Sequence, residues 1–140
     1  MVSAATSFGP VLASCQIALA LLPFVSIGEG TASGIVDPRE VVVESEQQWK
    51  TLWKQHAPSA PLPPPVDFTK EIVVGVIAGQ RPTAGYRVEI LRVERESEGL
   101  SVVYRVEGPA KDAMVAQVLT QPFKLVRLPG LGLPIRFKKL

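Results

Sequence analysis

The chain has 140 residues, enough for one domain, and its 15 basic and 13 acidic side chains give a formal net charge of +2. This near balance gives no electrostatic reason to expect a nucleic-acid or membrane-surface partner. A hydrophobic fraction of 46% is too high for a disordered chain. The 13 prolines favour short strands and many loops over a helical bundle.

The N-terminal segment is uncharged, because the first Lys, Arg, Asp or Glu of the sequence is Glu29. Residues from Val11 to Ile27 are almost all apolar or small, and this length fits a secretory signal better than a membrane-spanning helix of about 20 residues. Ser26-Ile27-Gly28 fits a small-x-small cleavage site, so we expect residues 1–28 to be a signal peptide or export segment, although no basic residue precedes the apolar run. The alternatives are a buried N-terminal helix or strand and a retained membrane anchor.

The only cysteine, Cys15, lies inside this segment. Leu12-Ala13-Ser14-Cys15 has the residue types of a bacterial lipoprotein cleavage box, so lipidation of Cys15 is an alternative mode of export. The strongest apolar run follows this cysteine, whereas it normally precedes one that is lipidated. Cleavage near Gly28 would leave a mature chain without cysteine, which must be stabilised by its core.

The first elements after this segment are a strand and a helix. The β-branched run within residues 40–44 predicts a short strand. Ser45 and Gln48 fit a capping box, which predicts a helix that begins at Ser45 and ends before Pro58. The apolar face of this helix carries Trp49, Leu52, Trp53 and His56. The proline-rich stretch 57–65 is expected to be an extended spacer.

The remaining chain reads as strands and turns. The apolar run 71–78 predicts a central strand buried on both faces, with Gly75 marking a bulge or a close backbone contact. Residues 86–96 and 100–107 predict a hairpin, and a change in apolar phase along the first strand predicts a bulge or a bend. Residues 115–119 and 123–128 are expected to form one bent strand or two short ones, and residues 135–138 a final edge strand. We therefore expect an α+β fold: an antiparallel sheet, curled into a sandwich or open barrel, with one helix packed across it.

The residue inventory offers little for catalysis. His56 is the only histidine, and at a helix C-terminus it is expected to cap or pack; an enzyme acting through His56 is the disfavoured alternative. No catalytic residue, cofactor or metal site is expected, because a lone histidine does not make an ordinary zinc site and the carboxylates are scattered. Residues 124–140 carry five basic and no acidic side chains, which we interpret as a basic edge strand and not as a nucleic-acid strip.

Several motifs in order resemble the PrcB C-terminal domain family. They are Trp49-Lys50-Thr51-Leu52-Trp53, Pro65-Val66-Asp67-Phe68, Val74-Gly75-Val76, Gly79-Gln80-Arg81-Pro82-Thr83-Ala84-Gly85-Tyr86 and Gln117-Val118-Leu119-Thr120-Gln121-Pro122-Phe123. The resemblance covers roughly residues 34–137, so a domain is expected at 34–140. It implies a non-catalytic, exported or lipid-anchored bacterial domain of the periplasm or extracellular space. It also implies a protein partner, with an accessory role in a protease complex as the expected function.

A second, weaker resemblance concerns one loop. Arg81-Pro82-Thr83-Ala84-Gly85-Tyr86 is similar to a loop of chagasin-type cysteine-protease inhibitors, although Gln121-Pro122-Phe123 is a poor match for that family's second signature. The resemblance implies an inhibitor of β-sandwich type as an alternative function. In both cases we expect the loop 81–86 to bind protein, with the polar side chains of Arg81 and Thr83 projecting from it. The competing interpretation is a simple turn from which Tyr86 enters the core.

Overall fold

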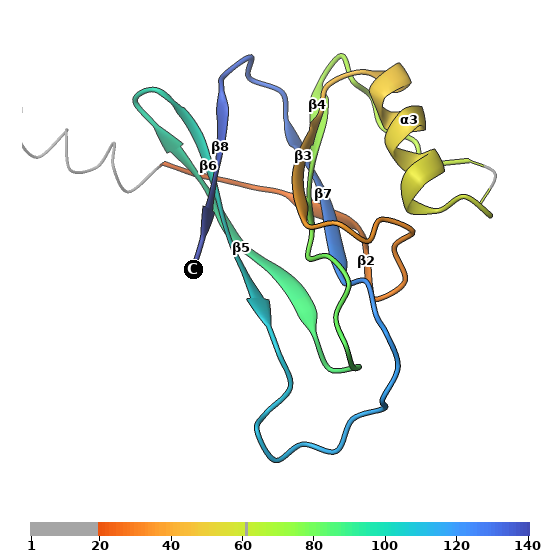
Figure 1. The fold of residues 1–140 in the computed structure, drawn as a ribbon. Helices are drawn as coiled ribbons and strands as arrows, with labels where there is room; N and C mark the ends of the chain where they lie inside the picture. The colour runs from red at the N-terminus through yellow and green to blue at the C-terminus, as the bar shows by residue number, and fades with distance from the viewer. Residues whose placement is uncertain (1–19, 61) are drawn as a thin grey trace, which may run out of the picture.

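The computed structural model describes residues 20–60 and 62–140, so Cys15 and residues 1–19 of the expected export segment lie outside the described residues. Eight strands and one helix make up the described part, and their labels are those of Figure 1. In chain order they are β1 (Leu21–Leu22), β2 (Val25–Gly30), β3 (Arg39–Val43), α3 (Glu46–His56), β4 (Glu71–Ile77), β5 (Arg87–Glu96), β6 (Gly99–Glu107), β7 (Phe123–Pro129) and β8 (Ile135–Lys139).

The strands form two sheets of four that face each other as a sandwich. One sheet has the order β1-β5-β6-β8 and the other the order β2-β7-β4-β3. Figure 1 shows α3 against the outer face of the second sheet. This arrangement confirms the predicted α+β sandwich with one helix. One pairing departs from the prediction, because β8 runs parallel to β6. The turn at 130–134 carries the chain from the second sheet to the first, so β8 does not fold back on β7.

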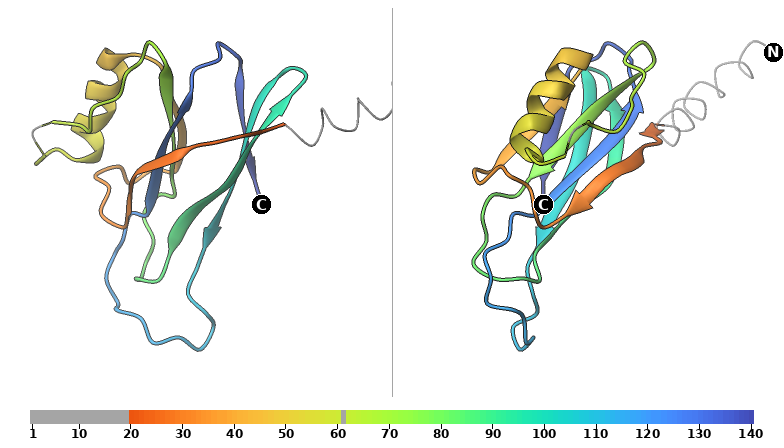
Figure 2. Two further views of the ribbon diagram at one scale, coloured as in Figure 1. Left: turned by 180° about the vertical axis from the view of Figure 1, so that it is seen from behind. Right: turned by 90° about the vertical axis from the view of Figure 1, so that its right-hand side faces the viewer.

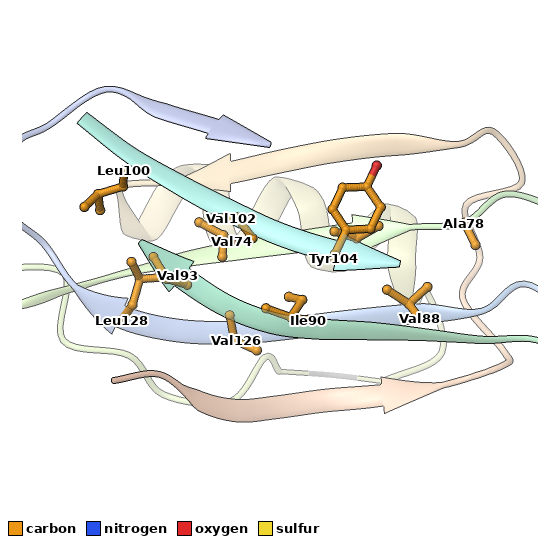
Figure 3. Close-up of a cluster of buried hydrophobic side chains, with 11 residues drawn as sticks. Val74, Ala78, Val88, Ile90, Val93, Leu100, Val102, Tyr104, Val126 and Leu128 are labelled. Carbon is orange, nitrogen blue, oxygen red and sulfur yellow. The ribbon is translucent and has the colours of Figure 1, made fainter. Parts of the chain in front are cut away.

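The core between the sheets is built by alternation along the strands. Every second residue of β6 and β7 faces inward, as expected for half-buried strands, and Figure 3 shows the aliphatic side chains of both sheets meeting there. Val93, Val102 and Val126 are fully buried at its centre. The register of β5 against β6 shifts between Ile90 and Arg92, which confirms the bulge predicted from the phase change.

A second cluster holds α3 onto the sheet. Trp49 is fully buried there, and its indole N–H donates to the carbonyl of Pro64 at 2.8 Å, so the proline-rich stretch lies along the helix. Ser45 caps the helix by accepting from the backbone N–H of Gln48 at 3.2 Å. The helix ends at His56, before Pro58, as predicted. β4 is the central strand that lies beneath it.

Gly75 of β4 is required by close packing and not by a bulge. Its pairing with Val41 and Leu125 is regular on both sides. A Cβ at this position would overlap Cδ2 of Leu125 and would lie 2.9 Å from Cγ2 of Val41. Of the two readings of this glycine, the structure therefore supports close contact.

The N-terminal strand segment joins the two sheets along one side of the sandwich. β1 pairs with β5 of the first sheet, and β2 pairs with β7 of the second. Leu22 and Phe24 pack on the core between the sheets, and Ile27 packs on the helix-side cluster. Figure 2 shows this orange segment crossing from one sheet to the other. Cleavage next to Gly28 would therefore remove β1 and most of β2.

The strand predicted at 115–119 is absent, and that prediction is wrong. Residues 113–119 carry no regular secondary structure and belong to the long connection from β6 to β7. Alternating apolar residues favour a strand only where a neighbouring strand can pair with them. Next to this segment, Thr120 forms an isolated β-bridge with Arg81 and no continuous strand.

Candidate functional site

Two loops lie side by side at one end of the sandwich. The first comprises residues 79–86, between β4 and β5, and the second comprises residues 108–122, between β6 and β7. Figure 1 shows both reaching beyond the strands at the lower end of the molecule, and the views in Figure 2 agree. We call these two segments together the loop end.

Backbone hydrogen bonds tie the two loops together. Arg81 and Thr120 exchange N–H···O bonds of 2.8 and 3.0 Å, and the N–H of Ala84 donates to the carbonyl of Ala116 at 3.0 Å. The hydroxyl of Thr120, which is buried, donates to the carbonyl of Thr83 at 2.9 Å. The first loop therefore acts as a support that fixes the position of the longer second loop.

Gly85 makes this close approach possible. Its φ of +94° lies in the region that favours glycine, and a Cβ there would lie 2.8 Å from Cβ of Pro109. The glycine thus meets both a conformational and a packing requirement.

The second loop exposes apolar side chains that sequence reasoning missed. Met114 is 100% exposed, Leu119 is 62% exposed and Val118 is 53% exposed. Three such side chains on one supported loop are typical of a surface that contacts another protein. The sequence signal was the pair of turn-forming positions Gly108-Pro109 and Pro122, which bracket an apolar segment and exclude it from the strands.

Arg81 does not project from the loop, which corrects our expectation. Its Nη2 donates to the carbonyl of Ala78 at 3.1 Å, and its guanidinium lies 5.6 Å from the centre of the Tyr86 ring. The hydroxyl of Thr83 likewise turns inward and donates to the carbonyl of Ala84 at 2.9 Å. Among the loop residues 81–86, Pro82 and Gly85 are the exposed ones.

His56 belongs to the packing of the helix. Its Nδ1 lies 2.9 Å from the hydroxyl of Ser33, and its ring stacks edge-on against Phe123 with centroids 4.2 Å apart. A serine and a histidine at this distance have the geometry of a nucleophile and its base. However, Ser33 is 3% exposed and His56 is 5% exposed, and the Ser33 hydroxyl also accepts from the N–H of Ile35. Burial lowers the pKa of His56, so the ring stays neutral. The pair is structural.

The basic residues between 124 and 140 do not form one strip. Lys124 pairs with Glu29 at 2.9 Å, and Arg127 pairs with Glu71 at 3.4 Å. These two lie on β7, whereas the other three lie on β8 in the opposite sheet. The positive charges are therefore divided between two faces, which does not suit a nucleic-acid backbone.

Within residues 20–60 and 62–140, no three His, Cys, Asp or Glu side chains lie close enough together to hold a metal ion. The helix found in the same ranges is too short and too polar to span a membrane.

Among the comparisons with known proteins, one match covers the part of the chain that carries the loop end. Comparison with curated proteins and with solved structures found no match. Residues 72–129, which run from β4 to the end of β7, match the family model described as PrcB C-terminal. This match includes both loops of the loop end. The predicted resemblance to the PrcB C-terminal family is thereby confirmed over residues 72–129.

Proposed function

We propose that this chain is a non-catalytic, exported protein-binding domain that serves a protease complex, and that it binds its partner through the loop end. The observation that carries the proposal is the set of exposed apolar side chains, Met114, Val118 and Leu119, on a loop that the family-matching segment holds in place. Burial of such side chains against a partner is favourable, and exposed apolar side chains that gather on one loop mark contact sites. The support from the family is the match of residues 72–129 to the PrcB C-terminal model.

The binding mode follows from how the loops are held. The loop 108–122 is long, but its backbone is bonded to the loop 79–86, which leaves less conformational freedom to be lost on binding. Burial of three exposed apolar side chains contributes about 1.5–3 kcal/mol each when burial is complete. We infer that Met114 and Leu119 are the main anchors and that the loop 79–86 acts mainly through support.

A protease inhibitor is the second candidate, because one observation favours it. Pro82 and Gly85 are exposed at the tip of a loop whose backbone is hydrogen-bonded on one side. A rigid exposed loop suits insertion into a cleft. A papain-like protease assayed with and without the domain separates the candidates. Inhibition that Pro82→Ala weakens supports the inhibitor, and capture of a protease without inhibition supports the accessory role.

The experiment for the leading proposal is affinity capture from an envelope extract with the domain as bait. The double variant Met114→Ser/Leu119→Ser should lose at least tenfold in affinity for the captured protein, since about 1.4 kcal/mol corresponds to a factor of ten. The control is Leu131→Ser, which changes another exposed leucine, 40% exposed, in the turn between β7 and β8 at the opposite end. Equal capture by all three proteins would contradict the proposal.

Export is part of the proposal and needs its own measurement. The support is the uncharged apolar N-terminal segment, with residues 1–28 or a lipidated Cys15 as the two modes considered. Intact-mass measurement of the native protein separates these modes. A cytoplasmic protein that retains Met1 would contradict export.

A further inference from the structure

The two open sides of the sandwich are bordered by different strands. The segment β1–β2 joins the sheets along one side, whereas β3 and β8 are the outer strands on the other side. Between the sheets on that second side lies a pocket of about 300 Å³, near the start of the loop 79–86. Its apolar lining comes from Val76, Ala78 and Val106.

The pocket is lined by one carboxylate, that of Glu40, which is already hydrogen-bonded. The hydroxyl of Tyr104 donates to a carboxylate oxygen of Glu40 at 2.5 Å, across the gap between the sheets. Burial, together with Glu40, raises the pKa of Tyr104, so the phenol keeps its proton. Figure 3 shows the Tyr104 hydroxyl pointing away from the aliphatic cluster. Glu40 is thus a fixed acceptor at the pocket.

The pocket also receives two positively charged side chains. Lys139 lies opposite Tyr104 in the parallel register of β6 and β8, so both side chains lie on the inner face of their sheet. Phe137, two residues earlier on β8, packs on the core, which fixes the same face for Lys139. Arg81 reaches the pocket from the loop end.

These cations stand apart from the ion pairs of the described residues. Five of the chain's eight arginines, together with Lys124, form ion pairs; the five are Arg87, Arg92, Arg105, Arg127 and Arg136. No ion pair within residues 20–60 and 62–140 involves Arg81 or Lys139. Arg39 also lines the pocket, but its guanidinium donates to Oε1 of Gln55 on the helix side. Two cations therefore meet at a pocket whose one carboxylate is bound to a tyrosine.

We propose that this pocket binds a carboxylate on a short apolar stem, with Lys139 and Arg81 as its counter-charges. The apolar lining fits the stem, and a volume of about 300 Å³ lies at the lower end of the range of ligand sites. The inference rests on the proposed function in one respect, which is that the carboxylate belongs to the protein partner. It comes either from an Asp or Glu side chain or from a C-terminus, and both share this chemistry.

Three short peptides separate these sources in an NMR titration of the folded domain at millimolar concentration. They are acetyl-Ala-Ala with a free carboxylate, acetyl-Ala-Ala amide, and acetyl-Ala-Glu-Ala amide. The amide signals of Ala78, Tyr104 and Val106 should move with at least one of the charged peptides and not with the neutral one. The peptide that binds identifies the source of the carboxylate. Equal shifts with the neutral peptide, or no shift with any of the three, would overturn the inference.

A matched pair of variants locates the counter-charge. Lys139→Met should weaken binding of the charged peptide about tenfold, which is the effect of losing one charge-assisted hydrogen bond. Lys138→Met removes the neighbouring charge, whose side chain lies on the other face of β8, and should leave binding unchanged. An equal effect of both variants, or of neither, would contradict the assignment. If partner capture fails in the Met114→Ser/Leu119→Ser variant but not in Lys139→Met, this inference is overturned while the proposed function stands.

Discussion

A chain that begins at Leu21 and a chain that begins at Glu29 should differ in stability. The shorter chain lacks β1 and most of β2, and with them Leu22, Phe24 and Ile27. Each of these side chains is partly buried, so each contributes roughly 1 kcal/mol, about half the value for full burial. We therefore expect the shorter chain to lose about 3 kcal/mol of the free energy of unfolding, a large part of the 5–15 kcal/mol typical of a domain.

Urea denaturation of the two chains measures this difference directly. Phe24→Ala in the longer chain should lower the free energy of unfolding by about 1–2 kcal/mol, and Val25→Ala, at a position 49% exposed, should change it by less than about 0.5 kcal/mol. Equal midpoints for the chains beginning at Leu21 and Glu29 would refute the reasoning. That result would also make cleavage next to Gly28 compatible with a stable domain.

Three further changes test separate parts of the structure. Gly85→Ala should destabilise the domain more than Gly132→Ala in thermal unfolding, because both have positive φ but an added Cβ meets Pro109 only at Gly85; equal losses would exclude the packing argument. Gly75→Ala should cost at least about 2 kcal/mol, because its Cβ would overlap the side chain of Leu125, and a neutral result would contradict the close contact. Burial lowers the pKa of His56 below 6.5, so the unfolded chain gains a proton before the folded chain as pH falls. The free energy of unfolding should therefore decrease below about pH 6.5, and His56→Gln should remove this part of the dependence on pH. The same dependence on pH in the variant would refute this.

The elements with strong local signals were predictable from the sequence. The helix 46–56 follows from the Ser45 cap and from apolar residues at helical spacing. The hairpin of β5 and β6 follows from alternation, and its bulge follows from one change of phase. In each case the determining residues lie close together in the sequence, so tertiary contacts did not have to be known.

The features that depend on distant partners were not predictable. The hydrogen bond between Tyr104 and Glu40 joins residues 64 positions apart, and nothing local to either residue indicates it. The parallel pairing of β8 depends on which sheet the chain reaches after the turn at 130–134. The segment 115–119 has the alternation of a strand but no strand beside it, so a pattern argument alone gave the wrong element there.

The candidate site was predicted in part. The loop 81–86 was expected to bind protein, and that role stays a prediction. The structure adds the loop 108–122 and shows Arg81 and Thr83 turned inward, because backbone carbonyls at Ala78 and Ala84 accept from their side chains. The sequence led us to expect projecting side chains on the loop 81–86, whereas the structure exposes large apolar side chains on the loop 108–122.

Hydrogen exchange of the domain with and without its captured partner tests the central claim most directly. The account predicts that partner binding slows exchange of backbone amides within residues 108–120 and 79–86, and leaves exchange in α3 and in the turn at 130–134 unchanged. Protection confined to α3 or to that turn, with no change in the loop end, would contradict the proposed binding surface.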